Sequence, residues 1–120
     1  MAKILAVDDS ASMRGMVAFT LRGAGHEVTE AEDGQKALDA AGAGKFDLVL
    51  ADVNMPVMDG ITMVKQLRTK ADYQGVPILM LTTESDTNKK MEGKAAGATG
   101  WLVKPFDPDK LLATVNRVLG

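Results

Sequence analysis

One passage of the sequence, residues 46–60, reads Phe46-Asp47-Leu48-Val49-Leu50-Ala51-Asp52-Val53-Asn54-Met55-Pro56-Val57-Met58-Asp59-Gly60. Its apolar run, Leu48 to Ala51, is short and unbroken, which is typical of a strand buried on both faces in a parallel sheet. The run ends at the carboxylate of Asp52, and Asp59-Gly60 then leads into a predicted helix. Ligands of open α/β sheets collect at the carboxyl ends of the strands, so Asp52 is a candidate site residue. The alternative is an ordinary loop aspartate.

Strand-length apolar runs alternate with segments of helical period along the whole chain. The predicted strands are residues 3–7, 27–31, the run that ends at Asp52, 77–81 and 101–103. Predicted helices follow Ser10 or Ser12, Asp33-Gly34, Asp59-Gly60, Ser85 or Asp86, and Asp107-Pro108; the third runs to about Lys70, and the fourth has the weakest amphipathic pattern. Right-handed β–α units place helices on both faces of a parallel sheet, and five units are too few for an eight-fold barrel. The sequence therefore predicts one α/β domain over residues 1–120, a doubly wound five-stranded parallel sheet with five helices.

The composition excludes several classes of site. The chain of 120 residues has no cysteine and a single histidine, His26, which rules out thiolate and His-rich metal sites and argues against a serine–histidine triad. The net charge of −2 argues against binding to nucleic acid, and Lys89, Lys90 and Lys94 form a basic cluster that a solvated helix face or an acidic partner would explain. The N-terminal apolar run is too short for a signal peptide, and no stretch approaches the roughly 20 apolar residues of a membrane span. We expect a cytoplasmic protein.

Polar residues stand at the carboxyl end of four predicted strands. Asp8 and Asp9 follow the first strand, Asp52 ends the third, Thr82 follows the fourth and Lys104 follows the fifth. Each alone has a structural explanation as a helix cap, a turn residue or a surface lysine. Because the carboxyl ends of parallel strands open on one edge, their joint occurrence favours a functional site.

Three carboxylates at one edge repel one another, at a cost of roughly 4 kcal/mol for a pair about 4 Å apart at an effective dielectric constant near 20. Either one carboxylate is protonated or a cation lies among them. Oxygen ligands without His or Cys suit a hard cation such as Mg²⁺. Lys104 and Thr82 could hold the oxygens of a phosphoryl group, with Asp52 as a carboxylate nucleophile that forms an acyl phosphate.

The chain closely resembles the receiver domain of two-component response regulators, and most of all the stand-alone chemotaxis regulators of the CheY type. The resemblance covers essentially all of the chain, and its motifs are Asp8-Asp9, residues 52–60, Thr82-Thr83-Glu84 and residues 97–106, Gly97-Ala98-Thr99-Gly100-Trp101-Leu102-Val103-Lys104-Pro105-Phe106. It implies a flavodoxin-like sheet with the strand order 2-1-3-4-5. It also implies a signalling protein that catalyses only its own phosphorylation and dephosphorylation.

The resemblance assigns the phosphorylation chemistry to five positions. Asp52 would accept a phosphoryl group from a phosphohistidine on a sensor kinase, and Lys104 would pair with the phosphoryl oxygens. Asp9 and Asp52 would bind Mg²⁺ through their carboxylates, Asp8 would act largely through water, and the backbone carbonyl of Asn54 would be a further ligand.

The resemblance also assigns roles in switching and in phosphoryl lifetime. Thr82 would move to hydrogen-bond the phosphoryl group, with the aromatic side chain of Trp101 following it inward. Family members usually have tyrosine or phenylalanine at this position, so the alternative is a tryptophan that covers the seam between the fifth strand and the fourth helix. The Lys104–Pro105 bond is expected to be cis. Asn54 and Glu84 occupy positions that tune dephosphorylation.

The implied partners are a sensor histidine kinase of the chemotaxis type, the flagellar motor switch protein and a phosphatase, with the chain itself a monomer. Because no effector domain follows Gly120, we expect output by binding another protein. A single-domain regulator in a phosphorelay or a non-chemotaxis pathway is the alternative within the class. An aspartyl-phosphate phosphohydrolase of the haloacid dehalogenase type would need an aspartate where the chain has Asn54. A flavin binder is disfavoured because Asp8-Asp9 would repel the flavin phosphate.

Overall fold

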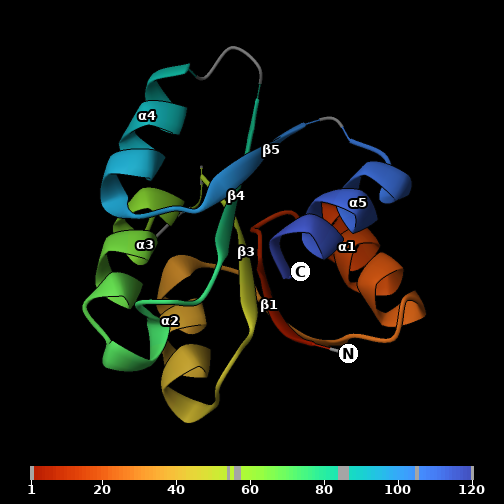
Figure 1. The fold of residues 1–120 in the computed structure, drawn as a ribbon, viewed down its shortest axis with the longest axis horizontal. Coiled ribbons are helices and arrows are strands. Elements are labelled where there is room, and N and C mark those ends of the chain that lie inside the picture. The colour runs from red at the N-terminus through yellow and green to blue at the C-terminus, as the bar shows by residue number, and fades with distance from the viewer. Residues whose placement is uncertain (1, 54, 56–57, 84–86, 105, 120) are drawn as a thin grey trace.

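The computed structural model describes residues 2–53, 55, 58–83, 87–104 and 106–119. Five parallel strands form one sheet in the order β2-β1-β3-β4-β5, as the resemblance implied (Figure 1). The strands are β1 (Lys3–Val7), β2 (Glu27–Ala31), β3 (Leu48–Asp52), β4 (Ile78–Thr83) and β5 (Gly100–Lys104). The helices are α1 (Ala11–Gly23), α2 (Gly34–Ala43), α3 (Gly60–Arg68), α4 (Thr87–Ala96) and α5 (Pro108–Leu119), with a 3₁₀ turn, η1 (Ala71–Tyr73). The predicted fold class is confirmed.

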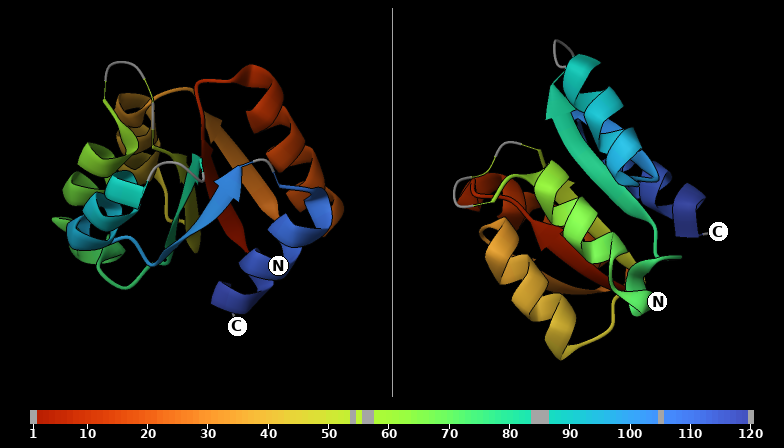
Figure 2. Two further views of the ribbon diagram at one scale, coloured as in Figure 1. Left: turned by 90° about the horizontal axis from the view of Figure 1, so that it is seen from above. Right: turned by 90° about the vertical axis from the view of Figure 1, so that its left-hand side faces the viewer.

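The helices form two layers, with α1 and α5 on one face of the sheet and α2, α3 and α4 on the other (Figures 1 and 2). Successive side chains of a strand point to opposite faces of the sheet, so each strand contributes residues to the hydrophobic cores on both faces. In β3, Val49 and Ala51 pack with α2 and α3, while Leu48 and Leu50 pack with α1 and α5. All five residues of β3 are buried, which is why its sequence is an unbroken apolar run.

Strand β2 lies at one edge of the sheet and pairs only with β1 among the described strands. Ala31 is its one fully buried residue, and this agrees with the weaker apolar pattern of residues 27–31. The exposed positions of β2 include Glu27 and Glu30. An edge strand therefore presents acidic side chains beside α1.

Four helices begin at the capping residues that the sequence predicts. Side-chain oxygens accept hydrogen bonds from backbone N–H groups three residues later at Ser10, Asp33, Asp59 and Asp107. Gly25, after α1, has φ of +94°, a conformation that favours glycine. Helix α3 ends at Arg68 rather than near Lys70, because the backbone of Lys70 is extended and η1 begins after it. The predicted cap of α4 at Ser85 or Asp86 lies outside the described residues.

Helix α4 contributes little apolar surface to the core, as its sequence predicts. Gly93 is buried and Ala96 is partly buried, whereas Met91 is 67% exposed. No helix among the described ranges is long and apolar enough to span a bilayer.

Arg68, at the end of α3, connects the C-terminal end of α4 to the segments around it. Its guanidinium donates hydrogen bonds to the main-chain oxygens of Tyr73, Val76 and Gly97. Burial lowers the pKa of Arg68. Gly97 has φ of +113°, and a Cβ atom there would lie 2.9 Å from Cγ of Arg68. The end of α4 is therefore fixed to the end of α3 by a planar, multivalent donor.

We expect Arg68→Lys to lower the free energy of unfolding by about 2 kcal/mol, because a compact ammonium group lacks the planar, five-donor fork that reaches three separate carbonyl oxygens. Urea unfolding followed by circular dichroism measures the effect. The control is Arg117→Lys, an exposed position in the last turn of α5. Equal stability of the two variants would show that the guanidinium of Arg68 is not needed to fix the end of α4 to the end of α3.

Candidate functional site

Strand pairing brings three aspartates together at the carboxyl edge of the sheet. Val7, the last residue of β1, pairs with Ala51 in β3, so Asp8 follows β1 beside Asp52. One carboxylate oxygen from each of Asp8, Asp9 and Asp52 lies within 4.8 Å of the others. Asp8 and Asp52 are buried, with residue exposures of 2% and 7%, while Asp9 is exposed. The sequence-predicted acidic residues thus form one cluster, which we call the acidic cluster.

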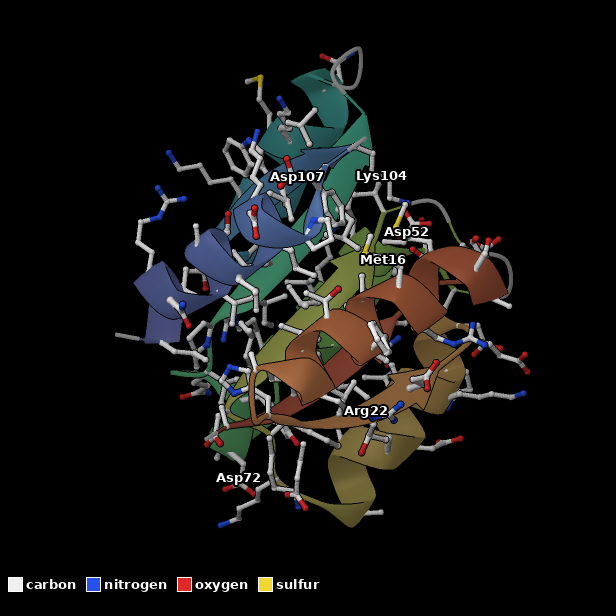
Figure 3. All side chains as sticks on the ribbon, turned by 90° about the vertical axis from the view of Figure 1, so that its right-hand side faces the viewer. Met16, Arg22, Asp52, Asp72, Lys104 and Asp107 are labelled. Atoms are coloured by element: carbon white, nitrogen blue, oxygen red, sulfur yellow. The ribbon has the colours of Figure 1, made fainter. Side chains whose placement is uncertain are left out.

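Lys104 reaches the acidic cluster from the end of β5. Its Nζ lies 3.2 Å from Oδ1 of Asp52 and 3.5 Å from Oδ2 of Asp8, and Figure 3 shows Lys104 beside Asp52. The lysine side chain is 21% exposed. A single ammonium therefore pairs with two buried carboxylates, and it offsets only part of their charge.

Most polar atoms of Asp8 have a hydrogen-bond partner. Its N–H donates to the Ala31 carbonyl at 3.1 Å, its carbonyl accepts from Arg14 at 2.6 Å, and Oδ1 accepts from the Ser10 N–H at 2.9 Å. Oδ2 is buried and has no hydrogen bond; its contact is the longer ion pair with Lys104. Buried carboxylate oxygens are costly without a partner, so this atom is suited to a cation.

The acidic cluster fits Mg²⁺. Its donor set is three carboxylates with no nitrogen or sulfur ligand, which is the ligand type of hard divalent cations. The cluster carries more negative charge than Lys104 offsets, and Oδ2 of Asp8 has unused acceptor capacity. Asp8, Asp9 and Asp52 would be the residues that hold the ion.

Gly60 positions the start of α3 directly against the end of β3. Its N–H donates to the Val53 carbonyl at 2.9 Å, and a Cβ atom at Gly60 would lie 2.2 Å from the carbonyl oxygen of Asp52. The same Cβ atom would lie 2.8 Å from Cε of Met80, whose Cγ faces Gly93 of α4 at 3.6 Å from that residue's Cβ position. Glycine is required at position 60 because α3 approaches the backbone of Asp52 so closely.

The residues with predicted switching roles are placed on neighbouring strands. Thr82, near the end of β4, is buried with 3% exposure, and Trp101 of β5, opposite Met80 in the strand register, is 37% exposed. The side chain of Trp101 is thus not enclosed in this structure. Asn54, Glu84 and Pro105 lie outside the described residues, so their predicted roles and the cis Lys104–Pro105 bond stay predictions.

Two residues at the site were not singled out by sequence reasoning. Arg14 contacts the backbone of Asp8, but it adjoins the apolar stripe of α1 and resembles an ordinary helix arginine. Gly60 was predicted as a helix start and not as a close contact of Asp52. Tertiary packing, which the local sequence pattern does not report, gives both residues their importance.

The family model of the response regulator receiver domain matches residues 4–116 of the chain. The chain belongs to this family. The match covers nearly the whole sheet and the acidic cluster, so the chain is a receiver domain, which is a signalling module. The match supports the receiver interpretation over the phosphohydrolase and flavin-binder alternatives.

Several relatives are similar over almost their full length. The chain is 39% identical to chemotaxis protein CheY-3 of Vibrio cholerae over 97% of this chain and 90% of the relative. It is 38% identical to protein PilH of Pseudomonas aeruginosa over 99% of this chain and 98% of the relative.

Solved structures show the same fold. The chemotaxis response regulator CheY4 of Vibrio cholerae superposes with a TM-score of 0.94 at 58% identity, covering 98% of each chain. The receiver domain of the sensor histidine kinase PA1611 of Pseudomonas aeruginosa has a TM-score of 0.92 at 29% identity, covering 99% of this chain and 98% of that chain, and its structure has a magnesium ion coordinated in the active site cleft. The magnesium ion in that receiver domain supports the fit of Mg²⁺ to the acidic cluster of this chain.

We expect Mg²⁺ to raise the melting temperature, because a bound cation relieves the repulsion among the three carboxylates. At a concentration about ten times Kd, the added stability is about 1.4 kcal/mol. Asp52→Asn should raise the melting temperature of the metal-free protein and reduce the response to Mg²⁺. Differential scanning calorimetry measures both effects, and Asp72→Asn, an exposed carboxylate on η1, is the control. A melting temperature that millimolar Mg²⁺ leaves unchanged would rule out the metal site.

Proposed function

We propose that the chain is a phosphorylation-activated single-domain response regulator in which Asp52 accepts a phosphoryl group from a sensor histidine kinase. The observation that carries the proposal is the pairing of Lys104 with both Asp52 and Asp8, at 3.2 and 3.5 Å, beside the exposed Asp9. This arrangement combines a carboxylate nucleophile, a counter-charge for phosphoryl oxygens and a cation site at one edge of the sheet.

The proposed transfer uses the carboxylate of Asp52 as the nucleophile. One of its oxygens forms a bond to phosphorus while the N–P bond of the phosphohistidine breaks, and the leaving imidazole takes a proton. The ammonium of Lys104, already at the Asp52 carboxylate, would then pair with an oxygen of the phosphoryl group. Asp8, Asp9 and Asp52 would hold Mg²⁺, with the backbone carbonyl of Asn54 as a further ligand. When bound, the ion would neutralise negative charge on the phosphoryl oxygens during the transfer.

The resulting acyl phosphate is removed by water, and we assign the tuning of this step to Asn54 and Glu84, the positions two residues beyond Asp52 and Thr82. The chain is thus proposed to catalyse only its own phosphorylation and dephosphorylation, and to act in the cytoplasm as a monomer.

Phosphorylation is proposed to change the surface formed by α4, β5 and α5. Thr82 lies on β4, between β3, which carries Asp52, and β5, which carries Trp101. Trp101 is 37% exposed, so an inward movement that follows a shift of Thr82 would bury side-chain surface that solvent now reaches. Helix α4 has little buried apolar surface, which makes it a segment whose position a small free energy can bias.

The output partner is proposed to be the flagellar motor switch protein, with a chemotaxis histidine kinase as phosphoryl donor and a phosphatase as a further partner. Relatives named as chemotaxis proteins support this assignment. The relative named PilH carries a different name at similar identity, so a non-chemotaxis or phosphorelay regulator is the second candidate.

Incubation with Mg²⁺ and a small acyl phosphate should add one hydroxylamine-labile phosphoryl group, because Asp52 is the carboxylate that Lys104 contacts at the shorter distance. Intact-mass spectrometry measures the modification. Asp52→Asn should abolish it, whereas Asp72→Asn should not. A label that persists in Asp52→Asn would move the acceptor to another residue.

Binding to a motor-switch peptide should tighten on phosphorylation if the chemotaxis assignment is correct. Fluorescence anisotropy of a labelled peptide from the flagellar motor switch protein of the same organism, with and without acyl phosphate and Mg²⁺, measures the change. Asp52→Asn is the control and should bind weakly under both conditions. Equal, weak binding of the phosphorylated wild-type protein would favour the non-chemotaxis candidate.

A further inference from the structure

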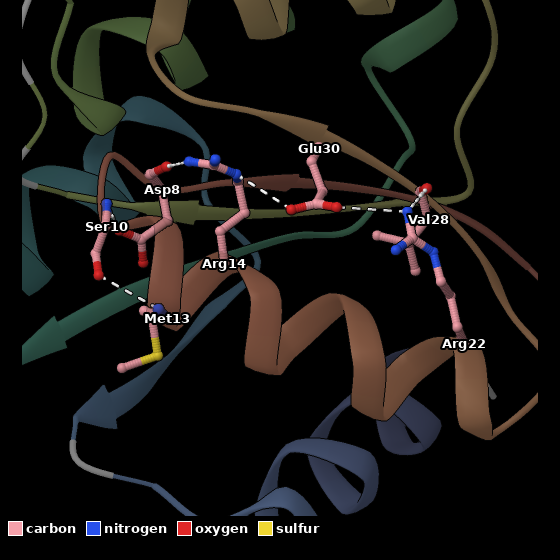
Figure 4. Close-up of polar contacts among 7 residues, drawn as sticks. All are labelled: Asp8, Ser10, Met13, Arg14, Arg22, Val28 and Glu30. Atoms are coloured by element: carbon pink, nitrogen blue, oxygen red, sulfur yellow. Dashed lines mark hydrogen bonds and ion pairs between the residues drawn. The ribbon is translucent and has the colours of Figure 1, made fainter.

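Arg14 is a largely buried cation at the acidic cluster that the proposed phosphoryl transfer does not use. It lies in the first turns of α1, its side chain is 17% exposed, and it points toward the loop between β1 and α1 (Figure 4). Its Nη1 donates to the main-chain oxygen of Asp8 at 2.6 Å, and its Nε donates to Oε1 of Glu30 at 3.2 Å. The guanidinium thus contacts the acidic cluster through the backbone of Asp8, and it pairs with the carboxylate of Glu30.

The hydrogen bond from Arg14 completes the set that orients Asp8. The Asp8 N–H is held by the Ala31 carbonyl of β2, and Oδ1 is held by the Ser10 N–H. Arg14 holds the carbonyl group, and a hydrogen bond from a charged donor is stronger than one between neutral groups. With these three atoms engaged, Oδ2 is left as the buried oxygen that faces Lys104.

Glu30 on the edge strand β2 orients Arg14 in turn. Its Oε1 accepts from Nε of Arg14, and its Oε2 lies 3.5 Å from Nη2 of Arg22, which also donates to the Val28 carbonyl at 2.9 Å (Figure 4). Both carboxylate oxygens of Glu30 therefore contact arginines of α1. This contact uses one edge of the Arg14 guanidinium and leaves Nη1 directed at Asp8.

We propose that Arg14 is a positioning residue for the cation site, which fixes the β1–α1 loop through the Asp8 carbonyl and is itself oriented by Glu30. The inference rests on the proposed function, since it assumes that the acidic cluster binds Mg²⁺. Partners of this kind, one shell removed from the ligands, set the orientation of the ligands and hence the affinity for the metal.

The sign of the effect separates positioning from simple electrostatics. A positive charge near a cation site repels the cation, so loss of the Arg14 charge alone would tighten Mg²⁺ binding. Loss of the hydrogen bond that holds the loop would weaken it, because part of the binding free energy would be spent on ordering Asp8 and Asp9. The two mechanisms predict opposite changes in Kd.

The test is Mg²⁺ binding by isothermal titration calorimetry, with circular dichroism to establish that each variant is folded. We expect Arg14→Met to raise Kd about tenfold, the low end of the range for partners of metal ligands. Glu30→Gln should raise Kd by a smaller factor. Arg14→Lys should give a Kd between those of the wild-type protein and Arg14→Met. The matched control is Arg22→Met, which removes the same charge and the same kind of Glu30 contact from the same helix without touching Asp8; its Kd should equal that of the wild-type protein.

A Kd for Arg14→Met that is unchanged or lower than wild type, with Mg²⁺ still bound by the wild-type protein, would overturn the positioning role and leave the proposed function intact. An equal rise in Kd for Arg14→Met and Arg22→Met would also overturn the positioning role. Absence of Mg²⁺ binding by the wild-type protein would overturn the metal site of the proposed function and this inference together. If Arg14→Met does not fold, Arg14→Gln is judged by the same criteria.

Discussion

Electrostatic repulsion among Asp8, Asp9 and Asp52 is the constraint on which the rest of the site depends. The sheet order places β1 beside β3, and the three carboxylates meet within 4.8 Å at one edge. The protein offsets part of that charge with Lys104, whose ammonium contacts two of the carboxylates. It also uses the remaining polar atoms of Asp8 to hold the loop in place. The negative charge that is left over makes the edge suited to a cation. A bound cation in turn makes the edge suited to a phosphoryl group, because its positive charge offsets the negative charge of the phosphoryl oxygens.

The division of the molecule into two flanks follows from the same sheet order. On one flank, β2 and α1 support the loop that carries Asp8 and Asp9, through Ala31, Arg14 and Glu30. On the other flank, β4, β5 and α4 carry Thr82, Lys104 and Trp101, with α4 fixed at its C-terminal end through Arg68 and Gly97. The receiver-domain family model spans both flanks and the edge between them.

Sequence patterns predicted the fold well because they report local physics. The unbroken apolar run of β3, the caps at Ser10, Asp33, Asp59 and Asp107, and the polar residues at strand ends each follow from neighbouring residues. The strand order came from the family resemblance. The partnership of Arg14 with Asp8 and Glu30 was missed because it requires β2 to lie beside α1. The contact of Gly60 with the Asp52 carbonyl and the end of α3 at Arg68 were missed for a similar reason, since tertiary packing sets both.

Met80 lies between two glycines of different helices, with Cε toward Gly60 of α3 and Cγ toward Gly93 of α4. An unbranched thioether changes rotamer at little cost, and glycines present no side chain that it must clear. The joint between the sheet and these two helices is therefore compliant rather than interlocked. A branched side chain in the same place would couple the two helices as rigid bodies. With methionine, the contact between the sheet and Gly93 of α4 can adjust while α3 stays against the backbone of Asp52 and the C-terminal end of α4 stays fixed by Arg68.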